Sequence, residues 1–308
     1  MNAITPISKQ LTLIRREFWE QRIMFILVPV GIIMLAAVFF SLATFRNYVN
    51  DVSSINIFVG GGFQFTGQSA EEAMITFVQM PPDAKVLMWN RFYYGPIPLV
   101  FITFWGCMIY YYLMTLFQQR KDRGILFWNS MPVSNAQTVI SKLLAGLFIA
   151  QMIYVLVMLA VQLVCLVVFL VYGMAMGLDL WANFIEPAHI FRRTFWLMIF
   201  AAVNVFWCLP VYAWMLMISS WARMAPLAWA VAPLVAVIIP ELIIYGRSDI
   251  LSTVFEHAIP TWMFDSVGTR GDFTRNLPNV LNGELVLGAI IGMALVYATI
   301  RINRSEDI

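Results

Sequence analysis

Charged residues are scarce in this sequence. They make up 12% of its 308 residues, whereas 61% are hydrophobic. A typical soluble domain is about half apolar and about a quarter charged. With so few polar groups, a chain of this size cannot cover a water-soluble surface, so lipid must solvate many of the apolar side chains. The composition excludes an ordinary soluble globule and predicts an integral membrane protein.

Cysteine, histidine and the common catalytic motifs are also sparse or absent. The three cysteines have no CxxC spacing, which excludes a zinc site or a disulfide framework of the usual pattern. The two histidines, His189 and His257, fall in different predicted loops, and His189 with Glu186 is best interpreted as a solvated surface pair. No G-x-S-x-G or H-E-x-x-H motif occurs. We therefore expect a chain that is not an enzyme and that holds no metal or cofactor.

The sequence contains no nucleotide-binding loop either. The pattern G-x-x-x-x-G-K-[ST] is missing, and the only glycine cluster, residues 60–62, is not followed by Lys-Ser or Lys-Thr. If ATP is used, another chain must bind it. The formal net charge of +2 gives no indication of a nucleic-acid partner.

Long apolar runs bounded by charges predict the transmembrane helices. About 20 mainly apolar residues are needed to cross roughly 30 Å of hydrocarbon. Six runs satisfy this requirement within one transmembrane domain, residues 1–308. They are residues 23–45, 96–117, 139–171, 195–219, 226–245 and 284–300. The expected fold is an all-α membrane protein with six transmembrane helices.

The distribution of Lys and Arg predicts the orientation. Basic residues are denser in the short segments before the first span, between spans two and three, between spans four and five, and after the last span. By the positive-inside rule these segments are cytoplasmic, which places both termini inside. The longer loops, residues 46–95 and 246–283, are then extracytoplasmic.

Short amphipathic segments flank the spans. In residues 1–22, Ile7, Leu11, Ile14 and Phe18 form an apolar stripe, which predicts an interfacial helix along the inner membrane surface. Outside, the spacing of Ser69 and Glu72 fits a capping box ahead of a short helix. Residues 252–264 are expected to be an amphipathic or re-entrant segment, or else a plain loop.

Polar or helix-breaking residues inside the spans are candidates for the translocation pathway. One interpretation of Glu241 is a polar group that lines the pathway or makes an interhelical contact. The other is a carboxylate that reaches the outer membrane interface or pairs with Arg247. Pro233 and Pro240 predict a kinked or locally unwound fifth span, which suits either a moving helix or a static bend.

Two further patterns predict helix packing. Gln151, Tyr154 and Gln162 share one face of the third span, which indicates a helix seam or a polar cavity rather than a lipid-facing surface. Gly288 and Gly292 form a GxxxG in the last span, a spacing that allows two helices to approach closely and that is weak support for a dimer face.

The inner loop between spans two and three, residues 118–138, carries the most specific pattern. A charged turn is followed by a short apolar run, then by Pro132 and a helix restart capped by Ser134. An apolar run on the cytoplasmic side is a liability unless the membrane interface or a partner covers it.

This loop resembles that of the type-2 exporter permeases of ABC transporters. Members typically have an E/D-R-x-x-G-like charged turn, a short helix, Pro-Val-Ser and a Lys that opens the third span. The matching residues here are Lys121 to Gly124, then 125–131, then Pro132, Val133, Ser134 and Lys142. Six spans, internal termini and an amphipathic N-terminal helix also look like this family, although the outer loop at residues 46–95 is larger than a minimal member needs.

The resemblance implies a function and its partners. The short helix would be a coupling helix that docks on an ATPase subunit, and residues 1–22 would be the elbow helix. The chain would be a multi-pass inner (cytoplasmic) membrane subunit, dimerised with itself or a similar chain and paired with two ABC ATPase subunits that bind ATP and Mg. The implied ATPase-coupling residues are Arg120, Lys121, Asp122, Arg123, Gly124, Ile125, Leu126, Phe127, Trp128 and Pro132.

Two other classes remain as alternatives. A membrane-embedded enzyme acting on lipid or isoprenoid substrates usually needs clustered acidic, His or Cys residues, which are scattered here. An ion-coupled secondary transporter normally has several intramembrane ionisable groups and often an inverted repeat, whereas the predicted spans contain one Glu and no repeat.

Overall fold

The described parts of the chain are almost entirely helical. The structure, a computed structural model, describes residues 6–35, 38, 77–86, 89, 97–121, 134–258 and 281–305. The first half of the described chain contains α1 (Pro6–Glu20), η1 (Ile23–Leu27), α5 (Ile97–Lys121), α7 (Asn135–Leu144), η2 (Ala145–Ala150) and α8 (Gln151–Ala175). The second half contains η3 (Trp181–Ile185), α9 (Glu186–Ala188), α10 (Ile190–Trp207), α11 (Leu209–Trp221), α12 (Pro226–Tyr245), α13 (Asp249–Ala258) and α16 (Gly283–Ser305).

Several of these helices are long and apolar enough to cross a membrane. Among the described residues there are five such stretches, and a sixth if the bent pair Lys9–Glu20 and Ile23–Leu35 counts as one span. The five are Val100–Lys121, Asn135–Ala175, Trp181–Trp207, Pro226–Tyr245 and Gly283–Arg304. This confirms the predicted class, an all-α membrane protein.

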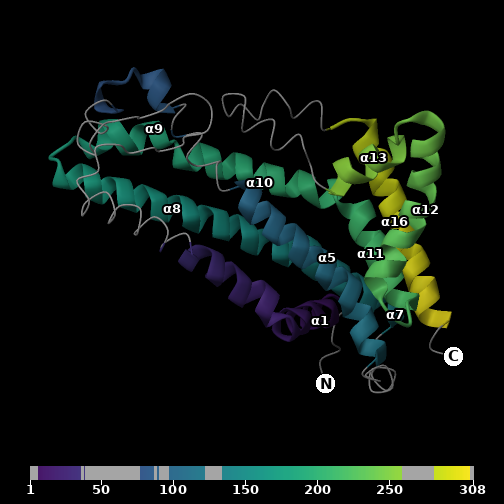
Figure 1. The fold of residues 1–308 in the computed structure, drawn as a ribbon. Coiled ribbons are helices and arrows are strands. Elements are labelled where there is room, and N and C mark those ends of the chain that lie inside the picture. Colours follow the sequence, from purple (N-terminus) through teal and green to yellow (C-terminus); the bar gives the residue numbers. More distant parts are fainter. Residues whose placement is uncertain are drawn as a thin grey trace, which may run out of the picture.

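The helices form two groups that meet at one end of the molecule (Figure 1). The long α8 and α10 run alongside each other in one group, and α11, α12, α13 and α16 gather in the other. α5 joins the groups because it packs on both α8 and α11. α1 lies against α7 and η2, close to the end where α16 finishes.

Asn135–Ala175 is one continuous helical stretch that includes α7, η2 and α8. At 1.5 Å per residue it is about 60 Å long, roughly twice the hydrocarbon thickness. Its first part, α7, buries Val139, Ser141, Lys142 and Leu143 against other helices of the protein. The third predicted span therefore begins as a protein-covered helix before it reaches its lipid-exposed part.

The fourth predicted span, residues 195–219, is not a single helix. α10 ends at Trp207, Cys208 separates the two elements, and α11 begins at Leu209. Pro210 explains the break, because proline has no backbone N–H to donate and its ring clashes with the carbonyl four residues earlier. α11 thereby turns away from α10 and packs between α16 and α5 (Figure 1).

α12 is the fifth predicted span, for which a kink or a local unwinding is expected. Pro233 and Pro240 both lie inside one uninterrupted α-helix, so the predicted local unwinding is absent. Each proline removes only one backbone donor, and small local adjustments in a membrane helix re-satisfy the freed group. Gly246 ends the helix in the left-handed conformation that glycine adopts without strain.

The GxxxG of α16 packs inside the chain. A Cβ atom added at Gly288 would lie 2.8 Å from Nε2 of His257, and one at Gly292 would lie 2.7 Å from Cγ of Leu209. These close approaches join α16 to α13 and to the start of α11. In this structure the two glycines therefore serve packing between helices of one chain.

The short helices predicted for the outer side are described in part. Phe77–Gln79 and residues 82–86 are helical, whereas Ser69 and Glu72 lie outside the described residues. Phe77 and the fully buried Trp89 pack against Phe184 of η3. Within the segment 252–264, residues 252–258 belong to the helix α13, and residues 259–264 lie outside the described residues. The Trp207 indole donates to the carbonyl of Glu256 in α13 at 2.7 Å.

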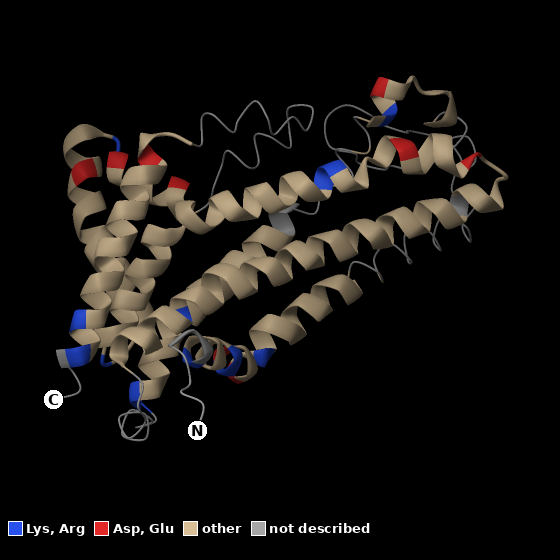
Figure 2. Cartoon of the chain, turned by 180° about the vertical axis from the view of Figure 1, so that it is seen from behind, with Lys and Arg blue, Asp and Glu red and all other residues tan. Residues whose placement is uncertain are grey.

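Charge is distributed unevenly between the two ends of the molecule (Figure 2). Most basic residues of α1, α5 and α16 gather at one end, and the acidic residues of α12, α13 and the start of α16 lie at the other. The C-terminal end of α16 and α1 share the basic end.

Candidate functional site

The inner loop, residues 118–138, joins α5 to α7 at the basic end of the molecule. α5 ends at Lys121 and α7 is capped by Ser134, so Arg120 and Lys121 are the predicted coupling residues that the structure describes. The other predicted coupling residues, Asp122 to Trp128 and Pro132, lie outside the described residues. The structure therefore describes the two flanks of the loop, residues 118–121 and 134–138.

Arg120 fixes the first flank to α11. Its Nη2 donates to the carbonyl oxygens of Ser219 at 2.5 Å and Ala222 at 2.9 Å. These carbonyls belong to the C-terminal end of α11, where backbone acceptors lack intrahelical partners and the helix dipole favours a cation. Ser219 Oγ in turn accepts from the backbone N–H of Leu116 and Phe117 in α5. The end of α5 and the end of α11 therefore hold each other.

A capping box defines the second flank. The Ser134 hydroxyl accepts from the backbone N–H of Gln137, and the Gln137 side chain accepts from the backbone N–H of Ser134. This reciprocal arrangement satisfies two otherwise unpaired donors and starts the helix at a defined residue. The side chain of Gln10 in α1 donates to the carbonyl of Gln137 at 3.3 Å.

One turn further along α7 lies a buried ion pair that the sequence analysis missed. Nζ of Lys142 is 2.8 Å from Oε1 of Glu17 in α1 and also donates to Oγ1 of Thr115 in α5 at 2.8 Å. The side chains of Glu17 and Lys142 are 0% and 1% exposed. Three helices thus meet at one ammonium group that is shielded from solvent.

Further charges surround this pair on α1. Arg16 contacts Glu17 at 3.0 Å and Glu20 at 3.1 Å. The pKa of Glu20 is raised above its usual value, because partial burial and the neighbouring Glu17 carboxylate outweigh the opposing effect of Arg16 and Lys142. Among the described residues, no hydrogen bond reaches Oε2 of Glu17. The pair therefore belongs to a charged group of which only the rim contacts solvent.

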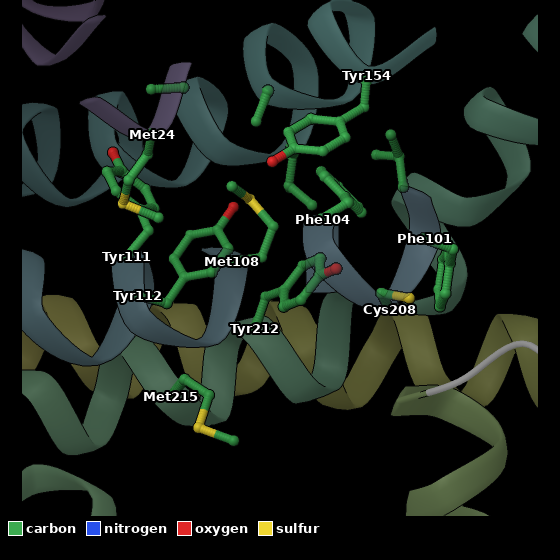
Figure 3. Close-up of a cluster of buried hydrophobic side chains, with 14 of the residues drawn as sticks. Met24, Phe101, Phe104, Met108, Tyr111, Tyr112, Tyr154, Cys208, Tyr212 and Met215 are labelled. Atoms are coloured by element: carbon green, nitrogen blue, oxygen red, sulfur yellow. The ribbon is translucent and has the colours of Figure 1, made fainter. Parts of the chain in front are cut away.

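Two tyrosines of α5 secure the junction between α7 and η2. The hydroxyls of Tyr111 and Tyr112 donate to the carbonyls of Lys142 and Leu143, both at 3.1 Å. At such a junction the helix changes from i+4 to i+5 hydrogen bonding, which displaces the bonding pattern by one residue. Gly146 permits the approach, because a Cβ there would lie 2.2 Å from the Tyr112 hydroxyl oxygen. Figure 3 shows both tyrosines in the aromatic cluster that Tyr212 of α11 completes.

The predicted seam residues of the third span occupy different surroundings. Oε1 of Gln151 accepts from Nδ2 of Asn204 in α10 at 3.2 Å, which places Gln151 in a contact between α8 and α10. Gln151 and Tyr154 also line a pocket of about 40 Å³ between α5, α8 and α10, which is large enough for water. Gln162 is buried.

The three predicted residues of the fifth span are not near this pocket. Pro233 and Pro240 lie on the exposed surface of α12. The Glu241 carboxylate accepts from the Ser248 hydroxyl at 2.5 Å and from the backbone N–H of Asp249 at 3.1 Å. Glu241 thus caps the start of α13, and Arg247 contacts Asp249 instead.

The structure and the comparisons define a class but not a family. Within the described residues, no three His, Cys, Asp or Glu side chains lie close enough to hold a metal ion. The chain matches no family model, no curated protein and no solved structure. It is an all-helical membrane protein whose basic end carries a loop held at both flanks.

Proposed function

We propose that this protein is the membrane-spanning permease subunit of an ATP-driven exporter of the type-2 ABC kind. The observation that carries the proposal is the inner loop, residues 118–138. Its sequence resembles the coupling segment of that family, and both of its flanks are bonded to other helices, through Arg120 to α11 and through α7 to α1. A loop held in this way can pass a push at its tip into the helix bundle.

The proposed mechanism follows from these contacts. ATPase subunits that close on ATP would press on residues 120–134. The displacement would reach α11 through Arg120, because its guanidinium bonds the last carbonyls of that helix. It would reach the third span through Asn135–Ala175, since this stretch is continuous. The two routes would shift the bundle between conformations of different stability, with ATP biasing the equilibrium.

The proposed assembly has separate chains for transport and hydrolysis. This chain has no phosphate-binding loop, so ATP and Mg would bind to two partner ATPase subunits. A second copy of this chain, or a similar permease, would complete the pathway in the inner (cytoplasmic) membrane. The residues proposed to contact the ATPase are Arg120 to Trp128 together with Pro132.

The proposal is tested by replacing the two largest apolar residues of the loop. Phe127→Asp with Trp128→Asp should abolish co-purification of an ATPase subunit while leaving membrane insertion intact, because charge in a docking surface is costly to desolvate. Phe255→Asp is the control, since Phe255 is 52% exposed in α13, which is not one of the membrane-spanning stretches. Retention of the ATPase by the double variant would contradict the proposal.

An ion-coupled transporter is the second candidate, and the buried Glu17 favours it. Ion pathways in membrane proteins use acidic side chains that are paired with a cation and shielded from solvent, as Glu17 is by Lys142. In that case Glu17→Gln would abolish a proton-driven pH change in proteoliposomes without ATP. An ATP-dependent exporter should produce no such signal in wild type or variant.

A further inference from the structure

The Glu17–Lys142 pair is a buried polar connection between α1 and α7. α1 packs mainly on α7 and η2. Gln10 of α1 donates to the carbonyl of Gln137, and the Glu17 carboxylate accepts from the ammonium of Lys142. Both hydrogen bonds join α1 to α7.

Burial makes this connection hard to open. Both side chains are almost completely shielded from solvent, and in such surroundings a charge without its partner is strongly unfavourable. Moving α1 away from α7 would leave the Lys142 ammonium with the Thr115 hydroxyl as its described partner. α1 and α7 are therefore expected to move together rather than to separate.

The position of α1 gives this connection a consequence for the first span. After α1 the chain bends by 75° into the helix Ile23–Leu35. Phe18 of α1 stacks on Phe25 beyond the bend, and Phe25 contacts Tyr111 of α5. A displacement of α1 is thus passed around the bend by packed aromatic rings as well as by the backbone.

We infer that the Glu17–Lys142 pair is a tether that makes α1 move with α7, so that displacement of the inner loop also reaches the first span. Glu17 and Lys142 are positioning residues in this role. The inference rests on the proposed function for the source of the displacement. The tether itself is a property of this chain alone and is measurable without any partner.

A double-mutant cycle on the purified protein tests the tether. Amide hydrogen exchange of residues 6–20 is compared in wild type, Glu17→Gln, Lys142→Met and the double variant. Each single variant should exchange at least tenfold faster, because it leaves one buried charge unpaired. The double variant should exchange no faster than either single variant, since it leaves no charge.

The control and the contradicting result use the same measurement. Glu20→Gln removes the half-exposed partner of Arg16 on the same helix and should change the exchange rate less than about fivefold. If the effects of the two single variants multiply in the double variant, Glu17 and Lys142 do not act as a pair and the inference is wrong. If a single variant fails to fold, the double variant is compared with wild type instead. An equal response of residues 6–20 to ATP-driven movement in these two proteins would then overturn the tether.

That movement is measured in the complex with its ATPase subunits. Trapping with ATP and vanadate should alter the exchange of residues 134–144 and 6–20 together in wild type, and that of residues 134–144 alone in the double variant. An equal response of residues 6–20 in both proteins would overturn the tether while leaving the proposed function intact. Failure to obtain any ATPase complex would instead contradict the proposed function, and the cycle on the isolated protein would still judge the tether.

Discussion

Glu17 and Leu11 lie in the same helix, yet the charged side chain is buried and the apolar one is 61% exposed. In water this arrangement would be inverted, but a helix at a membrane surface has lipid on one side and protein on the other. In the predicted interfacial position lipid would accommodate Leu11 and Trp19, whereas Glu17 requires a cation, which Lys142 supplies. Gln10 and Glu17 of α1 therefore face α7.

Arg120 provides a test at the scale of one residue. Arg120→Ala removes two charge-assisted hydrogen bonds to the end of α11 and should lower the free energy of unfolding by about 1.5–3 kcal/mol. Thermal unfolding of the purified protein measures this change. Lys121→Ala is the control, because Lys121 is exposed one residue further on, and it should cost less than about 0.5 kcal/mol. Equal losses in the two variants would show that Arg120 does not cap α11.

The sequence contained part of the signal for the buried pair. Lys142 follows Val139 and precedes Leu143 inside an apolar helix, a position where a lysine needs a partner. Glu17 was harder to recognise, because it lies beside the charged residues Arg16 and Glu20 and resembles one more solvated side chain. Its partner is 125 residues away in the chain, and no local pattern specifies a contact of that range.

At the scale of whole elements, the period and length of apolar runs located the helices but not their breaks. The fifth predicted span has the bounds of α12, residues 226–245. Within residues 195–219 apolar side chains continue through Pro210, so hydropathy gives no sign that α10 ends there. Two prolines in α12 are tolerated and one in the fourth span separates two helices. The difference lies in tertiary packing, because α11 gains contacts with α5 and α16 by turning away.

Helix packing by glycine is testable with two alanine substitutions that should have opposite effects. Gly292→Ala places a Cβ 2.7 Å from Leu209 and 3.1 Å from the backbone nitrogen of Pro210, and should destabilise the protein by about 1–3 kcal/mol. Gly106→Ala in α5 meets nothing within 4 Å and should stabilise it by about 0.5–1 kcal/mol through helix propensity. Denaturant-induced unfolding of the detergent-solubilised protein measures both changes in stability. A stabilising effect of Gly292→Ala would contradict the packing described.

At the scale of the whole molecule, composition alone was sufficient to identify the class. Low charge and long apolar runs require lipid whatever the arrangement of helices. The environment of each helix was not predictable in the same way. α12 and α11 are similarly apolar in sequence, yet α11 is largely buried and α12 is almost entirely exposed. Which apolar helix occupies the centre depends on contacts between distant segments, and single-helix patterns do not encode these.

The charge separation between the two ends predicts which positions are reached from each side of the membrane. A cysteine at Arg304, in a background without the native cysteines, should react with an impermeant thiol reagent only when the cytoplasmic side is accessible. A cysteine at Asp249, whose side chain is 75% exposed at the acidic end, should react only from the opposite side. Labelling of both positions from one side would contradict the proposed orientation.

The central claim, that this chain is a permease driven by separate ATPase subunits, is tested most directly by purifying the tagged wild-type protein from its native membrane. The co-purifying chains are identified by mass spectrometry and ATP turnover is measured with and without vanadate. The account predicts an ATPase subunit in stoichiometric amount and vanadate-sensitive hydrolysis. A protein that is purified alone and without ATP turnover would contradict it.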